Sequence, residues 1–257
     1  MLRRVFIFFA VLIFLIPVEE SYGQNRKVMN LPKYDNTQYH FGFTIGLNQL
    51  LFTIKPMPDI HTKMYYGVEN ALGELVLDSA MVMGINSRPT FGFEIGIVGD
   101  KRLGRYFNLR FVPTLSFGER YINYSIKTWQ NGEMKLIDLQ KNIGSVFIDF
   151  PLLIKYKSKR HNNMLAYLEA GGKYSLDIAS NARKQDLSGQ IIVKLNKNDV
   201  YAIVGVGFDF YNPWFKLGVE LKMSYGFMDI LKRDDTGLTQ SIEKLSSKVF
   251  QLGFTFE

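Results

Sequence analysis

Apolar and polar residues alternate with a period of two along most of this chain, and this pattern constrains the fold more than any other feature. Residues 214–226 show it best, because in the run FKLGVELKMSYG each large apolar residue is followed by a polar residue or a glycine. Successive side chains of a β-strand point to opposite faces, so the pattern predicts strands with two different faces. The same alternation marks the segments 41–48, 91–97, 107–117, 146–156, 164–177, 200–211 and 250–256.

The lengths of the segments and of their links favour a membrane barrel. Several segments approach the ~9–11 residues that a tilted strand needs to cross a bilayer. Short links at 99–105, 157–162 and 211–213 alternate with long links at 51–89, 127–143, 178–199 and 229–248. Short periplasmic turns and long extracellular loops are typical of bacterial barrels. We therefore expect an all-β fold, a transmembrane antiparallel barrel of about eight strands, although alternation alone leaves a soluble β-sandwich open.

Composition limits the other possibilities. A mean hydropathy of −0.03 is too polar for a bundle of membrane helices, while 21 Phe and 14 Tyr suit strands and the aromatic girdles of a barrel. The absence of cysteine excludes disulfides and thiolate metal sites. The net charge of +7 is spread along the chain rather than gathered in one patch, which does not favour nucleic-acid binding.

The N-terminus has the three parts of a secretory signal peptide. Two arginines precede an apolar run from Val5 to Ile16, and small residues stand before a cleavage point at Gln24. The run is shorter than the ~20 residues of a spanning helix, so a retained anchor is less favoured. We expect a signal peptide at 1–23, a polar, extended periplasmic lead-in at 24–38 and a barrel domain at 39–257, located in the cell outer membrane.

The polar face of the expected strands carries charges of both signs. In an eight-stranded barrel the lumen is just wide enough for side chains to fill it. A structural salt-bridge network therefore explains these charges more simply than a selective pore or a proton relay. The residues expected in the lumen are Glu94, Arg110, Asp149, Lys155, Glu169, Lys173, Lys216, Glu220 and Lys222.

Two of the short links are basic and would form a periplasmic rim. Ordinary solvation and contact with anionic headgroups explain such a rim, and docking of an acidic partner is the sharper alternative. The rim residues are Lys101, Arg102, Arg105, Lys157, Lys159 and Arg160.

No segment makes a convincing catalytic, cofactor or metal site. His61 lies in a long link near Asp59 and Asp78, a combination that is common by chance. Ser241 and Lys244 match S-x-x-K without the companion motifs of that enzyme class, and three histidines on separate segments do not suggest a metal centre. Gly205 and Gly207 are better explained as small lumen-facing residues than as a nucleotide loop, because Phe210 stands where a third glycine belongs. We expect a protein that is not an enzyme and has no cofactor.

Four segments carry a family resemblance. They are PKYDNTQYHFGFTIGLN at 32–48, GFEIGIVGDKRLGRYFNLRFVPTLSFGER at 92–120, IDFPLLIKYKSKR at 148–160 and VGVGFDFYNPWFKLGVELKMSYG at 204–226. Together they resemble the PorT (SprT) family of Bacteroidetes outer-membrane barrels.

The resemblance implies an accessory or assembly component of the type IX secretion system, which exports cargo with C-terminal signals and in some species gliding adhesins. It implies contact with other secretion components, and it supplies no catalytic residues. From the residues themselves we expect outer-membrane lipid as a partner, no nucleic acid, and no small-molecule substrate that the sequence identifies. The alternatives are a generic small barrel acting as an adhesin or a narrow channel, and a barrel enzyme using His61.

Overall fold

The computed structural model describes residues 28–68, 77–130, 132–179, 193–233 and 237–257. The expected signal peptide at 1–23 lies outside these residues. In the described part of the chain, eleven strands form one antiparallel sheet, and two short helical turns accompany it. The strands are β1 (Tyr39–Pro56), β2 (Tyr65–Val68), β3 (Leu77–Arg88), β4 (Thr90–Arg102), β5 (Phe107–Phe111), β6 (Thr114–Gln130), β7 (Glu133–Lys157), β8 (Met164–Asp177), β9 (Asn198–Tyr211), β10 (Lys216–Gly226) and β11 (Ile242–Phe256). No helix in this part of the chain is long and apolar enough to cross a bilayer.

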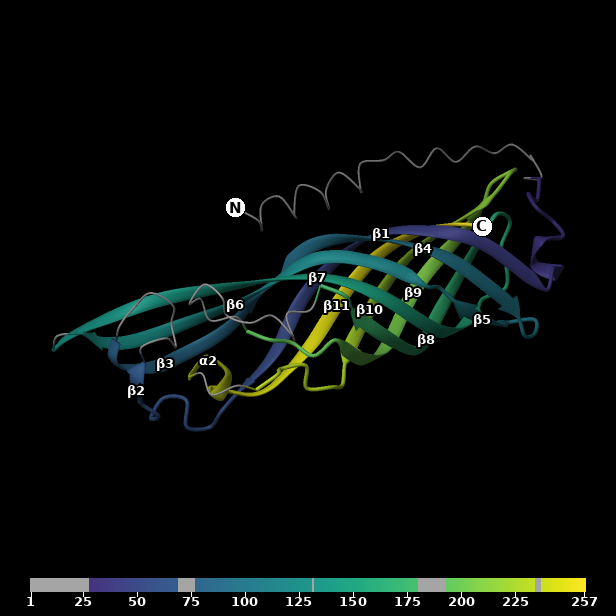
Figure 1. Ribbon diagram of the computed structural model, residues 1–257. Helices are drawn as coiled ribbons and strands as arrows, with labels where there is room; N and C mark the ends of the chain where they lie inside the picture. Colours follow the sequence, from purple (N-terminus) through teal and green to yellow (C-terminus); the bar gives the residue numbers. More distant parts are fainter. Residues whose placement is uncertain (1–27, 69–76, 131, 180–192, 234–236) are drawn as a thin grey trace, which may run out of the picture.

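The sheet closes on itself into a barrel (Figure 1). Strand β1 closes the ring because it pairs with β11 on one edge and with β4 on the other. Two wall strands are interrupted by prolines, which cannot donate to a ladder: Pro89 separates β3 from β4, and Pro113 follows the end of β5. Counted as single strands, β3/β4 and β5/β6 join β1, β7, β8, β9, β10 and β11. The prediction of an antiparallel barrel of about eight strands is confirmed.

The alternation seen in the sequence separates lipid from lumen. Large apolar side chains on the outer positions are exposed on the barrel surface, as Phe91 is at 80% and Ile97 at 64%. A belt of this kind is stable only against lipid chains, because water would leave so much apolar surface unfavourably hydrated. The inner positions of the same strands carry polar and charged residues. The alternation in the sequence therefore specifies a membrane strand that has an apolar face toward the lipid and a polar face toward the lumen.

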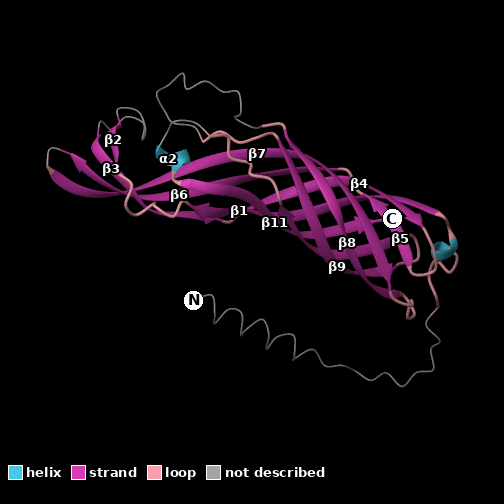
Figure 2. Ribbon diagram, turned by 90° about the horizontal axis from the view of Figure 1, so that it is seen from below, coloured by secondary structure: helices cyan, strands magenta, loops and turns pink. Residues whose placement is uncertain are grey.

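Above the lipid belt, the pattern inverts. Outer positions become polar at Asn123 and Ser125, while Ile122, Tyr124 and Ile126 point inward and are buried. Strands β6 and β7 run on together as a long extracellular hairpin, and Figure 2 shows it projecting beyond the crossing strands of the barrel. We call this part of β2, β3, β6 and β7 the extracellular extension.

The extension corrects one predicted link. The segment 127–143 was expected to be a long loop, but β6 continues to Gln130 and β7 begins at Glu133. Outside the membrane the outer face no longer needs apolar residues, so the contrast that marks a membrane strand disappears there. The long links at 51–89 and 229–248 also contain structure, namely β2, β3, the helix α2 (Gly237–Gln240) and the start of β11.

The lead-in is not extended, which corrects a second expectation. Tyr34–Asn36 form a turn of 3-10 helix, η1, immediately before β1. Its amide bonds run from Tyr34 to the Leu31 carbonyl and from Asn36 to the Lys33 carbonyl, both 3.1 Å long. The turn folds the lead-in back against the periplasmic end of the barrel.

Candidate functional site

The interior of the barrel is filled by long charged side chains lying across glycine positions. A Cβ atom at Gly205 would lie 2.8 Å from Lys222 Cγ and 3.0 Å from Glu169 Cγ. Gly46 and Gly253 leave similar room beside Glu94 and Glu220. The lumen-facing glycines of the sequence are therefore the spaces into which charged side chains of neighbouring strands fold.

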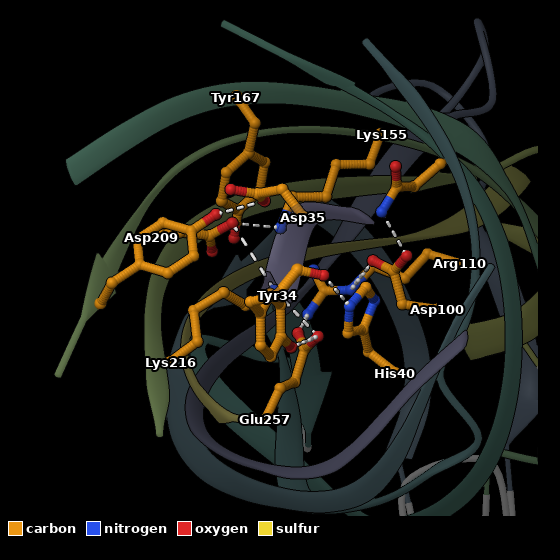
Figure 3. A network of polar contacts seen from close by, with 12 residues as sticks. Tyr34, Asp35, His40, Asp100, Arg110, Lys155, Tyr167, Asp209, Lys216 and Glu257 are labelled. Atoms are coloured by element: carbon orange, nitrogen blue, oxygen red, sulfur yellow. Dashed lines mark hydrogen bonds and ion pairs between the residues drawn. The ribbon is translucent and has the colours of Figure 1, made fainter. Parts of the chain in front are cut away.

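Arg110 on β5 stands at the centre of this network and has no exposed surface (Figure 3). Its Nη1 donates to Glu220 Oε2 at 2.7 Å and to Glu169 Oε2 at 3.2 Å, and its Nη2 donates to Glu257 Oε1 at 3.2 Å. One guanidinium thus joins β5 to β8, β10 and the C-terminal residue. A buried carboxylate needs such partners, since desolvating an unpaired charge costs several kcal/mol.

Lysines complete the network toward the periplasmic end. Lys155 Nζ donates to Asp209 Oδ2 at 2.8 Å and sits 3.6 Å from the centre of the Tyr167 ring. Lys216 lies 2.9 Å from Glu257 Oε2 and 3.7 Å from Asp209 Oδ2. Each of these four charges therefore has a counter-charge from a different part of the wall, and the pairs link β7, β9, β10 and the end of the chain across the lumen.

The remaining predicted charges lie deeper in the barrel. Lys173 Nζ donates to Asp149 Oδ2 at 2.9 Å, and Lys222 pairs with Glu220 Oε1 at 2.5 Å. Glu94 accepts a hydrogen bond from the Gln251 amide at 2.5 Å. All nine residues expected in the lumen are thus buried inside the barrel, eight of them in ion pairs.

The sequence reasoning missed several members of the network. Asp209 is odd-numbered like the lumen-facing Gly205 and Gly207, and Glu257 is odd-numbered like the lumen-facing Gly253 and Thr255. The alternation along both strands therefore already placed these two carboxylates in the lumen. Asp100 lies 4.0 Å from Arg110 Nε and accepts a short bond from the Asn108 amide. It was overlooked because it falls at the edge of a predicted turn.

A second buried arginine separates the charged layer from an apolar one. Arg120 donates to Ser247 Oγ and Ser145 Oγ at 2.8 Å and lies 3.5 Å from Asp177 Oδ2. Its guanidinium carbon lies 4.4 Å from the ring centre of Phe52 and 5.0 Å from that of Phe147. Stacking on aromatic faces is a favourable setting for a buried guanidinium.

The extracellular mouth is closed by a hydrophobic core. This core joins the strand extensions to residues of the loops and of α2, and it resembles the interior of a soluble domain. Such packing excludes water from the mouth of the barrel. Its buried members are Phe52, Ile60, Ala80, Val82, Ile122, Tyr124, Ile126, Ile143, Val193, Leu195, Ile230, Leu231, Leu238, Ile242 and Leu245.

The periplasmic mouth is closed by the lead-in. Tyr34 stacks on His40 with ring centres 4.1 Å apart and donates from its hydroxyl to Glu257 at 3.2 Å. Burial raises the pKa of the Tyr34 phenol well above its ordinary value, so the hydroxyl stays protonated as a donor. Leu31 and Tyr34 also pack against Leu165, Tyr167 and Tyr211. We call residues 28–38 in this position the periplasmic cap.

The six predicted rim residues do not form one surface. Lys101, Arg105 and Lys159 are exposed, while Lys157 is buried. Arg102 donates to the Asn36 carbonyl at 3.2 Å. Arg160 pairs with Asp35 at 3.5 Å and lies over the Tyr211 ring at 3.6 Å. Part of the basic rim therefore holds the periplasmic cap instead of facing the periplasm.

We predict that Arg160→Ala loosens the periplasmic cap. The substitution removes the ion pair to Asp35, the contact with Tyr211 and the bonds to the Asn30 and Leu31 carbonyls. Hydrogen exchange at the amides of residues 34–37 should accelerate roughly tenfold. Lys159→Ala, an exposed neighbour, should leave exchange unchanged. Equal exchange in the two variants would contradict this role for Arg160.

The segments considered for catalysis are scattered. His61 is exposed beyond the end of β1. Ser241 donates to the Leu238 carbonyl at 2.7 Å inside the extracellular core, whereas Lys244 is exposed. Gly205 and Gly207 lie within β9. Within the described ranges, no three His, Asp or Glu side chains gather as metal ligands.

Comparison with known proteins identifies the family of this chain. Residues 22–232 match the family model described as outer membrane protein beta-barrel domain. No curated protein matches the sequence significantly. Among solved structures, the outer membrane protein OprG of Pseudomonas aeruginosa is 11% identical with a TM-score of 0.41, over 86% of this chain and 97% of that one. Neisserial surface protein A is 11% identical with a TM-score of 0.38, over 85% and 98%.

Ail of Yersinia pestis, solved with the heparin analogue sucrose octasulfate, is 11% identical with a TM-score of 0.36, over 86% and 99%. The family match covers most of the chain, and its residues include seven of the eight wall strands. The chain therefore belongs to the outer membrane protein beta-barrel domain family and resides in the outer membrane.

Proposed function

We propose that this barrel is a non-catalytic accessory or assembly component of type IX protein secretion. The observation that carries the proposal is the filled lumen: a charged layer, an apolar extracellular core and a periplasmic cap succeed one another along its length. A barrel filled in this way acts through its surfaces. The segments that resemble the PorT family support the particular machine.

The partners proposed are outer-membrane lipid and other components of the secretion apparatus. The lipid belt supports the first. The periplasmic cap and the extracellular extension present protein surfaces on both sides of the membrane, which suits a component that holds an assembly together. No step in the proposal requires a bound cofactor or a small-molecule substrate.

A clean deletion of the gene tests this function. Cargo proteins with C-terminal export signals should accumulate in the periplasm and be restored to the surface by the wild-type chain. The variant Lys55→Met, which changes only an exposed ion pair, should restore export equally well. Normal cargo export in the deletion strain would end the proposal.

A surface-binding barrel is the second candidate, and the extracellular extension is the observation that favours it. In that case, shortening the β6–β7 hairpin should abolish attachment to a surface or to another cell while cargo export continues. The first candidate instead predicts that cargo export stops when the whole chain is deleted. The two phenotypes distinguish the candidates.

A further inference from the structure

The outer half of β7 has an edge that no described strand covers. Strand β6 pairs with β7 from Glu133 to Asp149, whereas β8 pairs with it only from Phe147 to Lys157. Residues 133–145 therefore have β6 on one side and no strand of the described chain on the other. Figure 1 shows this part of β7 running beyond the barrel beside β6.

The register identifies which backbone groups point to this open edge. The Val146 carbonyl accepts from Ile178 on the β8 side, while the Pro151 carbonyl accepts from Val112 on the β5 side. The pairing of β6 and β7 continues without a register shift, so the even-numbered residues of β7 face the edge. Outside the membrane, the N–H and C=O groups of the even-numbered residues from 134 to 144 therefore have no partner strand among the described residues. Such an edge is a template for another strand.

A groove lies at the membrane end of the edge and gives it a charge preference. Its volume is about 560 Å³, and its lining includes Glu119, Asn142, Gly144 and Ala179. No atom lies within 4 Å of the position that a Cβ would take at Gly144. The Glu119 carboxylate is exposed and is oriented by bonds from Tyr121 Oη at 2.7 Å and Asn142 Nδ2 at 3.3 Å. This end of the edge therefore offers room and an anchored negative charge.

The far end of the edge carries two exposed apolar side chains. Met134 is 56% exposed and Leu136 is 74% exposed, both on the outer face of the extension. An added strand would cover both side chains and remove their apolar surface from water.

We propose that the open edge of β7 binds an extended segment of another protein. The segment adds a strand to β7, places apolar side chains against Met134 and Leu136, and places a basic side chain beside Glu119. A second copy of this chain in the same membrane does not fit as an antiparallel strand. Antiparallel pairing would need a two-fold axis normal to the sheet, which would turn the two barrels in opposite directions. This inference does not depend on the secretion assignment.

A labelled peptide and two variants of the folded, full-length mature protein in detergent micelles test the proposal. The peptide alternates threonine and valine and carries one lysine near one end, and its binding is measured by fluorescence anisotropy. Gln140→Pro removes an edge-facing N–H and leaves the ladder with β6 intact, and it should weaken binding tenfold or more, by about 1.4 kcal/mol. Gln140→Thr keeps the N–H and should bind within about twofold of wild type.

Two further experiments test the charge of Glu119 and the backbone hydrogen bonds of the edge separately. Glu119→Gln should weaken binding of the lysine peptide by roughly threefold and leave a peptide with threonine at that position unaffected. A peptide with N-methylated edge-facing amides should fail to bind wild-type protein, whether or not Gln140→Pro folds. Binding by wild type no tighter than about 1 mM, or equal binding by Gln140→Pro, would overturn the proposal. Dimers of wild type that Gln140→Pro abolishes, or occupation of the edge by residues 180–192 of the same molecule, would also overturn it.

Discussion

Replacing Arg110 with methionine is expected to lower the free energy of unfolding by about 3–5 kcal/mol. The substitution keeps most of the side-chain volume and removes the charge that Glu169, Glu220 and Glu257 share. Glu220 retains Lys222 and Glu257 retains Lys216, but Glu169 loses its only ion pair within the described residues. An unpaired carboxylate in the barrel interior is the main source of the loss.

Equilibrium unfolding in urea, followed by heat-modifiable migration on gels, measures this effect. The matched control is Lys55→Met, which breaks an exposed pair of 2.6 Å to Glu243. Side chains that are 65% and 39% exposed contribute little through such a pair, so the control should change stability by less than about 1 kcal/mol. A loss of less than about 1 kcal/mol for Arg110→Met would contradict the central position given to this arginine.

The second large effect is expected for Gly207→Val, at about 3 kcal/mol of destabilisation. A Cβ at Gly207 would lie 2.5 Å from the Tyr167 hydroxyl, too close for any side chain. The ring cannot easily move, because its hydroxyl donates to Glu220 at 3.0 Å and Lys155 covers its face. Valine at this position therefore displaces part of the charged network as well as the tyrosine.

Gly172→Val is the control for Gly207→Val. Gly172 lies on the outer face of β8, and the nearest atom to its Cβ position is a backbone oxygen at 3.6 Å. Valine there adds an apolar group against lipid and a residue that suits a strand, so stability should stay the same or rise. Equal destabilisation by the two substitutions would show that the inner face is not packed as described.

The sequence predicted the wall of the barrel well because lipid and lumen impose opposite demands on alternate residues. Apolar residues occupy every second position in the runs around Phe91, Ile154 and Leu221, and this identifies the outer face of each strand. The β6–β7 hairpin gives no such signal, since above the membrane its outer positions carry polar residues such as Ser125 and Gln140. Its strands are held by the core beneath them, and a core assembled from distant loops cannot be located from local pattern.

The candidate site was predictable only where strand parity was clear. The nine lumen charges follow from alternation in well-marked strands, and Asp209 and Glu257 would have followed from the same rule. The periplasmic cap could not be foreseen, because it depends on Arg160 meeting Asp35 across a tertiary contact between distant segments. For the same reason, the basic residues of the turns looked equivalent in sequence although some hold the cap and others face solvent.

Conductance of the purified wild-type protein in a voltage-clamped planar bilayer tests the central claim most directly. The claim is that the lumen is filled from the periplasmic cap through the charged layer to the extracellular core. The structure predicts no conductance steps above the lipid baseline for protein whose folding and insertion are verified by heat-modifiable migration. Reproducible stepwise ion currents from the same protein would contradict a filled lumen and favour the alternative of a narrow channel.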